Sequence, residues 1–495
     1  MRQLTPLDAQ FLSLESATTT AHVGTVSIFD ASSAPPGAVT RKSLVALLRE
    51  RLPLAPPLRM LLADVPLWLD RPYWVDAEDF DPADHVHEAE LPAPGDDHQL
   101  AAYVAGVHAR RLDRSRPLWE AHLIHGLSGD RVALYTKIHH CAIDGVTGSE
   151  ILAAVLDPSP DPRLVEPPPP VEPERGPGLV GMLAGAVARS ALQPVETLCS
   201  LGRTLGDLDT LPVLSTLPDA RRIARAARAL AGDTRAVPET PPLVVPRTPF
   251  NGRITGARAV SFGSVPMGEV RRVARVFGMS PNDVVMTLCA SVLRRWLLAH
   301  GALPDRPLVA AVPVALRTAG GDLGNRISAM VMPLATEVAD PAERLAAVRS
   351  AMAAAKRRFV LSKRSWLNDV CAMFPAAFAK LATPIVFRML GVAGTGVNVI
   401  ISHVPGPRRP LYLCGARMLA CHPLSVVTDA TGGLSITCIS YDGRLDFGFV
   451  VCPDLVPDVW SLTGHLGDAL DELLRLAGET DRPEGTAPEE DKVPA

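Results

Sequence analysis

The sequence lacks any uninterrupted apolar run of about 18 residues, the length that a membrane-spanning helix needs. This holds although 47% of its 495 residues are hydrophobic and its mean hydropathy is +0.17. The longest candidate, residues 389–404, is interrupted by glycine and polar residues, and its Val/Ile-rich second half predicts a buried strand. Asp8 and Glu15 stand where a secretion signal needs its apolar core. We therefore expect a cytoplasmic protein without a spanning segment or a signal peptide.

Paired cysteines and an excess of one charge are also absent. The eight cysteines are scattered singly and form no C-x-x-C motif, which favours reduced core residues over a disulfide scaffold or a structural zinc site. The 49 basic and 53 acidic residues leave a net charge of −4, which argues against a nucleic-acid partner. The same charge balance, with the high hydrophobic content, excludes a disordered chain.

Proline is abundant, with 47 residues, and it marks the domain organisation. The stretch 157–178 is so rich in proline that it predicts an extended linker rather than helix or sheet. We accordingly divide the chain into an N-terminal domain (1–156), a Pro-rich and helical linker (157–245), a C-terminal domain (246–477) and a disordered tail (478–495).

Apolar periodicity and capping residues predict helices and strands in both halves. In the first half, helices follow Thr40 and Asp96, and a hairpin turns at residues 128–130. The second half shows the same kinds of signal. They predict helices that begin at Ser280 and Pro341, a last helix carrying Leu462 to Leu474, strands at 308–316 and 397–403, and a hairpin at 442–443.

The segment KIHHCAIDG, residues 137–145, is the strongest candidate for chemistry. A strand runs straight into His139 and His140, and because neighbouring strand residues face opposite ways, one imidazole can reach a cleft while the other packs behind it. Such a histidine suits a general base, and Asp144 and Gly145 suit the turn into the next helix. Packed structural histidines and an ordinary Asp-Gly turn stay open as the plainer alternative. A metal site is disfavoured, because no third ligand lies at ligand spacing.

The segment SPND at residues 280–283 has a complete structural explanation. Ser280 is a helix N-cap, Pro281 stands at the first helical position, and Asp283 closes a capping box. Trp119 is predicted to be a core aromatic at the start of the hairpin.

A basic helix is predicted in the linker, with Arg221, Arg225 and Arg228 on one face. Such a face either lies on anionic lipid or is simply solvated, and the sequence leaves both open.

With the chain around it, the motif H-H-x-x-x-D-G resembles the bacterial wax ester synthase/acyl-CoA:diacylglycerol acyltransferase family. That family lies within a superfamily that includes chloramphenicol acetyltransferase and peptide-synthetase condensation domains. His403 departs from the Asn that the family more often has there, at a position to which we give no catalytic role. The other blocks that carry the resemblance follow in order along nearly the whole chain: LTPLDAQFLSLES (4–16), RPLWE (116–120), SPNDVV (280–285), GDLGNRIS (321–328) and VPGPRRPLYLCGAR (404–417).

The resemblance implies an α/β fold of two mixed α/β domains of the chloramphenicol-acetyltransferase type, with the active site at their interface. His140 would be the general base that takes the acceptor's hydroxyl proton and later protonates the CoA thiolate, and His139 would steady the loop. Asp144 would pair with an arginine of the other domain, for which Arg317 is our candidate.

The resemblance also gives roles to the start of the helix at residue 281. Asn282, or the backbone N–H groups beside it, would stabilise the oxyanion of the tetrahedral intermediate. Gly145 and Asp283 would contribute to substrate binding. No covalent acyl-enzyme is expected, because there is no G-x-S-x-G motif and the strand direction turns Cys141 away from His140.

The implied substrates are acyl-CoA and either diacylglycerol or a long-chain alcohol, with no metal and no resident cofactor. Because these acceptors are lipids, we expect peripheral contact with the inner face of the plasma membrane or with lipid droplets. Two alternatives stay open. One is acyl transfer to another acceptor or from a carrier-bound donor, and the other is an inactive lipid-binding or scaffold protein.

Overall fold

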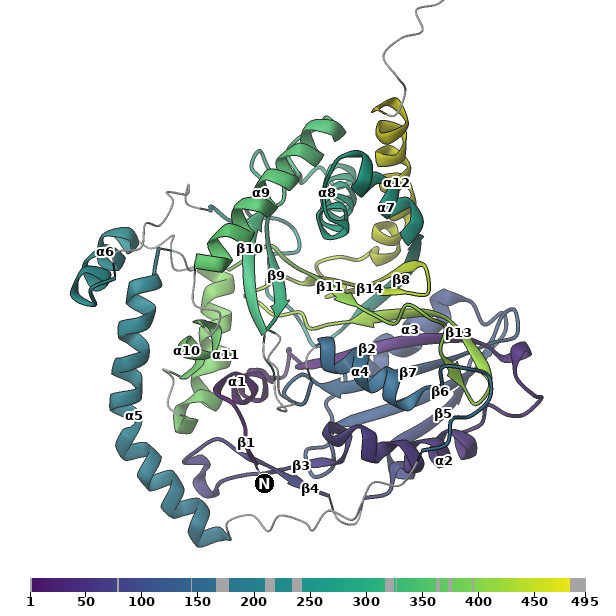
Figure 1. Cartoon of the computed structure of the whole chain (residues 1–495), viewed down its shortest axis with the longest axis horizontal. Coiled ribbons are helices and arrows are strands. Elements are labelled where there is room, and N and C mark those ends of the chain that lie inside the picture. The colour runs from purple at the N-terminus through teal and green to yellow at the C-terminus, as the bar shows by residue number, and fades with distance from the viewer. Residues whose placement is uncertain are drawn as a thin grey trace, which may run out of the picture.

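The computed structural model describes residues 2–77, 80–143, 145–165, 178–209, 219–233, 243–316, 325, 327–361, 366–372, 376–393 and 396–480. Two mixed α/β halves lie against each other, with a group of helices at one side (Figure 1). Asp144, Arg317, most of the Pro-rich segment and residues 481–495 of the expected tail lie outside the described residues.

The first sheet has six strands in the order β12-β13-β2-β7-β6-β5. Two strands from the second half of the chain complete the sheet: β13 pairs with β2, and β12 pairs with β13. The strands of this sheet are β2 (His22–Asp30), β5 (Val86–Glu90), β6 (Trp119–Leu127), β7 (Arg131–His139), β12 (Tyr412–Leu413) and β13 (Ala416–Leu424).

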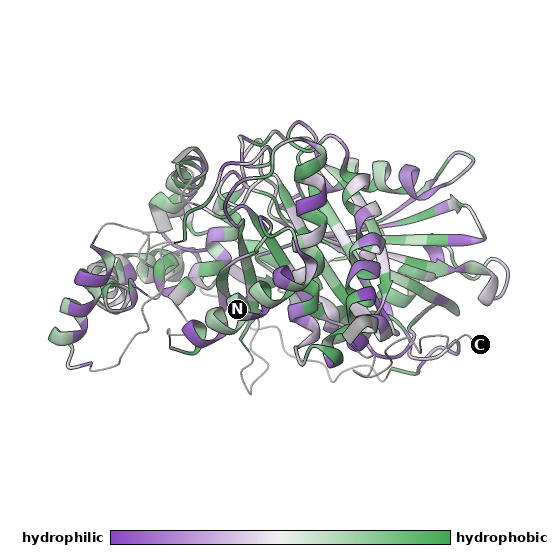
Figure 2. Cartoon of the chain, turned by 90° about the horizontal axis from the view of Figure 1, so that it is seen from above, coloured by the Kyte–Doolittle hydropathy of each residue, from purple (hydrophilic) through white to green (hydrophobic). Residues whose placement is uncertain are grey.

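The second sheet has the order β10-β9-β11-β14-β15-β8, and β11 is parallel to both of its neighbours. Four helices of the second half pack over it. Figure 2 shows that hydrophobic residues predominate along the strands at the centre of the molecule. The strands are β8 (Ala259–Pro266), β9 (Val309–Ala315), β10 (Ile327–Pro333), β11 (Val399–Pro405), β14 (Leu434–Tyr441) and β15 (Arg444–Val451). The helices are α7 (Met267–Val276), α8 (Pro281–Ala299), α9 (Pro341–Leu361) and α12 (Val459–Thr480).

The remaining elements surround these two sheets. A small sheet has the order β1-β4-β3, and helix α1 packs against α10 and α11 of the second half. The strands are β1 (Arg2–Gln3), β3 (Met60–Ala63) and β4 (Tyr73–Asp76). The helices are α1 (Pro6–Leu14), α2 (Arg41–Arg51), α3 (Asp97–His108), α4 (Gly145–Val155), α5 (Leu179–Asp207), α6 (Ala220–Leu230), α10 (Trp366–Ala372) and α11 (Ala376–Ala393).

Most of the predicted elements are confirmed. Thr40, Asp96 and Ser280 each cap a helix through a capping box, and both predicted hairpins form. Trp119 is buried, and its indole N–H donates to the carbonyl of Leu58 at 2.8 Å. Helix α12 reaches Thr480, so the first three residues of the expected tail are helical. The described cysteine thiols are all free.

The prediction of a basic face on α6 is wrong for one of its three arginines. Arg228 points inward, where it is buried and forms a two-pronged ion pair with Asp209, with both N···O distances 2.7 Å. This pair fastens α6 to the end of α5. Arg228 therefore cannot contribute to a lipid-facing surface.

No single helix in the described ranges is long and apolar enough to cross a membrane. Helices α7 and α8 pass that test only when taken together, and they are bent by 103° where they meet.

A shared core joins the two sheets. Strand β13 contacts β14 and β15, and side chains from both halves, such as Val104 of α3 and Phe262 of β8, belong to one buried cluster. The sheets approach closely at Gly448 of β15, where an added Cβ would lie 2.0 Å from the carbonyl oxygen of Pro423. Only a residue without a side chain fits there.

Replacing Gly448 by alanine should therefore destabilise the protein by about 1–3 kcal/mol, because the backbone of β13 must move. Thermal unfolding measures the loss. Gly464→Ala is the matched control, since its Cβ would meet nothing within 4 Å on helix α12. The control should keep or raise the melting temperature, and equal melting temperatures for the two variants would contradict the packing described.

Candidate active site

The histidine pair lies where strand β7 ends. His139 stands directly opposite His22 of β2, and its N–H donates to the carbonyl of Leu118 at 2.9 Å. The N–H of His140 donates to Ala21 at 2.8 Å, and the chain then turns, with Ala142 donating back to His139. The strand alternation therefore stops at His139. As expected, His139 is buried and His140 is partly exposed. The side chain of His140 contacts Phe11 of α1, and that of His139 contacts Glu15, the residue that ends α1.

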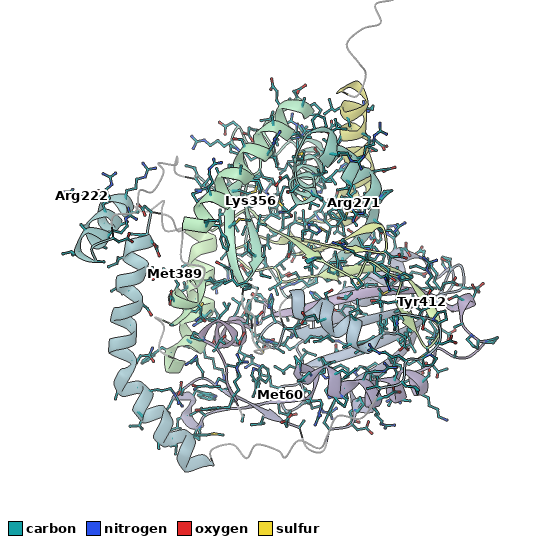
Figure 3. All side chains as sticks on the ribbon, viewed as in Figure 1. Met60, Arg222, Arg271, Lys356, Met389 and Tyr412 are labelled. Atoms are coloured by element: carbon teal, nitrogen blue, oxygen red, sulfur yellow. The ribbon has the colours of Figure 1, made fainter. Side chains whose placement is uncertain are left out.

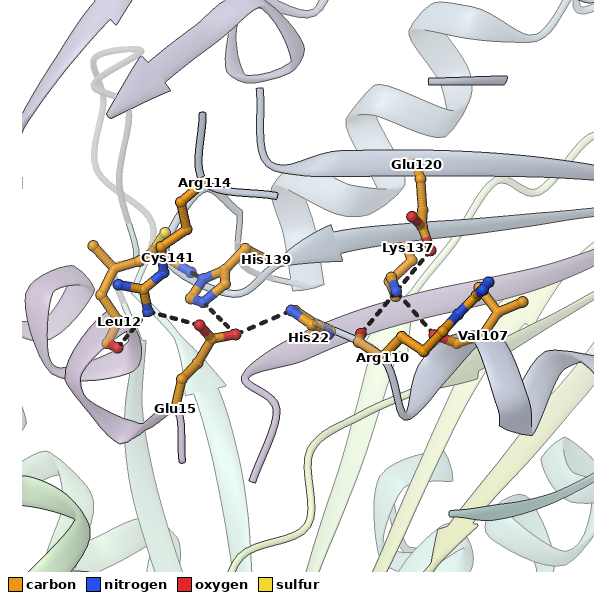
Figure 4. Close-up of polar contacts among 10 residues, drawn as sticks. All are labelled: Leu12, Glu15, His22, Val107, Arg110, Arg114, Glu120, Lys137, His139 and Cys141. Carbon is orange, nitrogen blue, oxygen red and sulfur yellow. Dashed lines mark hydrogen bonds and ion pairs between the residues drawn. The ribbon is translucent and has the colours of Figure 1, made fainter. Parts of the chain in front are cut away.

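His139 is held from both sides of its ring (Figure 4). Its Nδ1 accepts a hydrogen bond from the backbone N–H of Cys141 at 3.1 Å, so in the neutral ring the proton sits on Nε2. That Nε2 lies 3.4 Å from Oε1 of Glu15, the residue that caps α1. His22 approaches the same oxygen with its Nε2 at 3.1 Å, and Arg114 approaches the other oxygen at 2.6 Å.

The charges in this cluster follow from burial and proximity. Burial alone would raise the pKa of Glu15, but the contacts with His139, His22 and Arg114 outweigh it and hold that pKa far below its usual range. Burial lowers the pKa of His139, and it lowers the pKa of His22 to about 4. The cluster therefore contains a carboxylate, a guanidinium and two neutral imidazoles at neutral pH.

His140 is fixed by its ring and by its carbonyl. The imidazole stacks on Phe11 of α1, with ring centroids 4.0 Å apart and an interplanar angle of 6°. Its carbonyl accepts a hydrogen bond from the side-chain amide of Asn325. Asn325 also donates to Oδ1 of the buried Asp8, from its backbone at 3.0 Å and from its side chain at 2.8 Å. A residue of the second half thus links α1 to the histidine loop.

Asp8, Phe11, Glu15 and Asn325 were not predicted as site residues. They lie in two of the blocks that carry the family resemblance, residues 4–16 and 321–328, and Asp8 and Glu15 also argued against a signal peptide. The spacing 8, 11, 15 places three of these residues on one face of a short helix, and two of them are acidic at positions where an amphipathic helix would bury aliphatic side chains. That spacing was the signal available in the sequence.

Two further candidate residues lie at the start of α8. Asp283 accepts from the backbone N–H of Ser280 at 3.0 Å and pairs with Lys356 at 2.8 Å, contacts that support a capping role. Asn282 is half-buried, and its Oδ1 lies 3.3 Å from Nδ1 of His403 on β11. His403 had been given no catalytic role, but it touches the side chain proposed for the oxyanion.

Strand β11 connects the two groups of candidates. It contacts α8, which carries Asn282, and α4, which begins at Gly145 directly after the histidine loop. Because α4 belongs to the first half and β11 to the second, the candidates flank the interface of the halves. The expected pair of Asp144 with Arg317 lies outside the described residues and stays a prediction.

Two clusters in the described part of the chain have metal-ligand composition. In the first, made of Glu15, His22 and His139, the Nε2 of His139 carries its proton and the carboxylate already faces Arg114. In the second, made of His87, Glu120 and His122, the ammonium of Lys137 lies 2.6 Å from the carboxylate. Both donor sets fit a polar network better than a metal ion.

Cys141 is an unsuitable nucleophile. Its thiol is fully buried, and burial raises its pKa well above the usual value. The thiolate form that attacks a thioester is therefore disfavoured.

The fold and the histidine loop define a two-domain CoA-dependent acyltransferase of the chloramphenicol-acetyltransferase type. The first condensation domain of the calcium-dependent antibiotic synthetase shares this fold, with a TM-score of 0.52 and 17% identity over 97% of this chain and 98% of that one. Residues 4–285 match the catalytic domain of the wax ester synthase/diacylglycerol acyltransferase family, and residues 323–474 match its C-terminal domain. The chain therefore belongs to this family, and the expected fold and enzyme class are confirmed.

Individual relatives agree over nearly the full length. A Mycobacterium tuberculosis protein that carries the provisional name diacylglycerol O-acyltransferase is 35% identical over 98% of this chain and 92% of its own. The O-acyltransferase WSD of Acinetobacter baylyi is 29% identical over 95% and 96%. A solved structure, the wax ester synthase/diacylglycerol acyltransferase from Marinobacter aquaeolei VT8, superposes with a TM-score of 0.68 at 29% identity, covering 97% of this chain and 100% of that one.

Proposed function

We propose that the protein transfers a long-chain acyl group from acyl-CoA to the free hydroxyl of diacylglycerol, with long-chain alcohols as a second class of acceptor. The observation that carries the proposal is the histidine loop, in which His139 is locked by Glu15 and Cys141 while His140 stays partly exposed. A catalytic base must be held in one geometry and must be reachable by its substrate. His140 combines these two properties.

In the proposed reaction the acyl group passes directly from the thioester to the acceptor oxygen, without a covalent acyl-enzyme. His140 accepts the proton of the acceptor hydroxyl as the oxygen attacks the thioester carbonyl, and the C–S bond then breaks. The proton passes to the departing CoA thiolate, so the base is regenerated. Asn282 or the first N–H groups of α8 stabilise the oxyanion, aided by the positive end of the helix dipole. Gly145 and Asp283 are proposed to help bind the substrates.

The lipid acceptors suggest where the enzyme works. We propose that it acts at the inner face of the plasma membrane or at lipid droplets, as a peripheral protein. The likeness to condensation domains concerns the fold alone and does not favour a carrier-bound donor. A protein that only binds lipid would not need the locked His139 beside an accessible His140.

Replacing His140 by alanine should lower the rate of CoA release by about 10²–10⁴-fold, because proton transfer to the base is lost. The assay follows free thiol from purified protein with palmitoyl-CoA and diacylglycerol. Unchanged thermal unfolding shows that the variant is folded. Wild-type rates in a folded His140→Ala variant would remove the base from the mechanism.

Replacing Asn282 by alanine should lower turnover roughly tenfold or more and change the melting temperature little, because the oxyanion loses a stabilising group. Ser280→Ala is the matched control, since it removes the N-cap hydroxyl of the same helix end, which accepts from the backbone N–H of Asp283. This control should lose stability more than turnover. Equal losses of both properties in Asn282→Ala would reduce this residue to a helix-terminus role.

A further inference from the structure

Helix α11 turns an apolar face to solvent. Its inner side packs on α1, where Ala379 and Thr383 are buried and the hydroxyl of Thr383 donates to Gln10 at 2.6 Å. The opposite side carries four large apolar residues at helical spacing, each between 53% and 74% exposed: Phe378, Leu381, Ile385 and Met389. Figure 3 labels Met389, the last of these four residues along the helix. A surface helix of a globular protein has the reverse orientation.

The short 3₁₀ helix η4 (Pro66–Trp68) extends this apolar surface. It contacts both α11 and α5, and the ammonium of Lys380 lies 4.3 Å from the centre of the Trp68 ring. Leu67 and Trp68 are both exposed, Leu67 by 80%. Both have positive φ angles, 57° and 53°, a conformation that bulky residues rarely adopt. The fold accepts this strain and holds the two side chains outside the core.

The charges around these residues are mainly positive. Helix α11 contains no Asp or Glu, and its exposed charged residues are Lys380 and Arg388. Of the acidic residues that flank η4, Asp70 is paired with Arg189, so the two cations outweigh Asp64. Cations beside exposed aromatic and aliphatic groups complement a lipid surface with negative headgroups.

We infer that Leu67, Trp68 and the four exposed apolar residues of α11 form a docking face for bilayers that contain anionic phospholipid. The apolar side chains insert at the headgroup level, and Lys380 and Arg388 contact phosphate. The inference rests on the proposed function, since it places the bilayer one helix away from the catalytic loop. Helix α1 lies between them and carries Phe11, which stacks on His140.

The test is co-sedimentation with vesicles of phosphatidylcholine containing phosphatidylglycerol. Leu381→Ser/Ile385→Ser should lower the partition coefficient by at least about tenfold, because two inserted side chains are lost. Lys380→Glu/Arg388→Glu should abolish the preference over pure phosphatidylcholine vesicles. The matched control is Leu298→Ser/Leu419→Ser, which removes two exposed leucines at the end of α8 and on β13 and should bind like wild type.

Further readouts separate the possible causes. Thermal unfolding shows that each variant is folded. CoA release with butyryl-CoA and a water-soluble alcohol should be unchanged in the α11 variants. Their turnover of diacylglycerol presented in vesicles should fall. Equal partitioning of wild type and the α11 variants overturns the inference. A change of oligomeric state by light scattering without a change in lipid binding also overturns it, in favour of a second copy. If wild type releases no CoA with any acceptor, the proposed reaction fails while the binding result stands.

Discussion

The contact between the Glu15 carboxylate and His139 is the interaction on which the rest of the site depends. It brings the end of α1 to the end of β7, where the side chains of Glu15 and His139 are 5% and 1% exposed. A buried carboxylate is costly unless it has partners, and Arg114 and His22 supply them. Since Cys141 occupies the other ring nitrogen, His139 has one tautomer and one orientation. The position of His140, the next residue, follows from that.

The two halves of the chain meet beside this contact, at Asn325, and neither half forms the site alone. Asn325 of the second half binds both Asp8 and the carbonyl of His140, while β12 and β13 complete the sheet that carries the histidines. Helix α1 packs on α11, whose outer face is apolar. A single helix thus connects the proposed base, the second half and the proposed lipid-docking face.

Local signals in the sequence predicted the elements well, because capping boxes and hairpin turns depend on neighbours in the chain. The choice of His139 and His140 also came from a local motif. The partners of these histidines could not be predicted in the same way, since Glu15, Phe11 and Asn325 reach them only through tertiary packing. The inward turn of Arg228 likewise depends on Asp209, which helix periodicity alone does not reveal. The pairing of β13 with β2 could not be predicted from local signals, because the two strands lie far apart in the sequence and meet only in the folded chain.

A double-mutant cycle on turnover tests the central contact most directly. Glu15→Gln removes the negative charge, and His139→Asn removes Nε2 while its amide oxygen can still accept from Cys141. If both residues act by positioning His140, each variant loses about tenfold to a hundredfold in kcat, and the double variant loses no more than the worse single one. The KM for acyl-CoA should change little. Losses that multiply in the double variant would show that the two residues act independently, and would contradict the account.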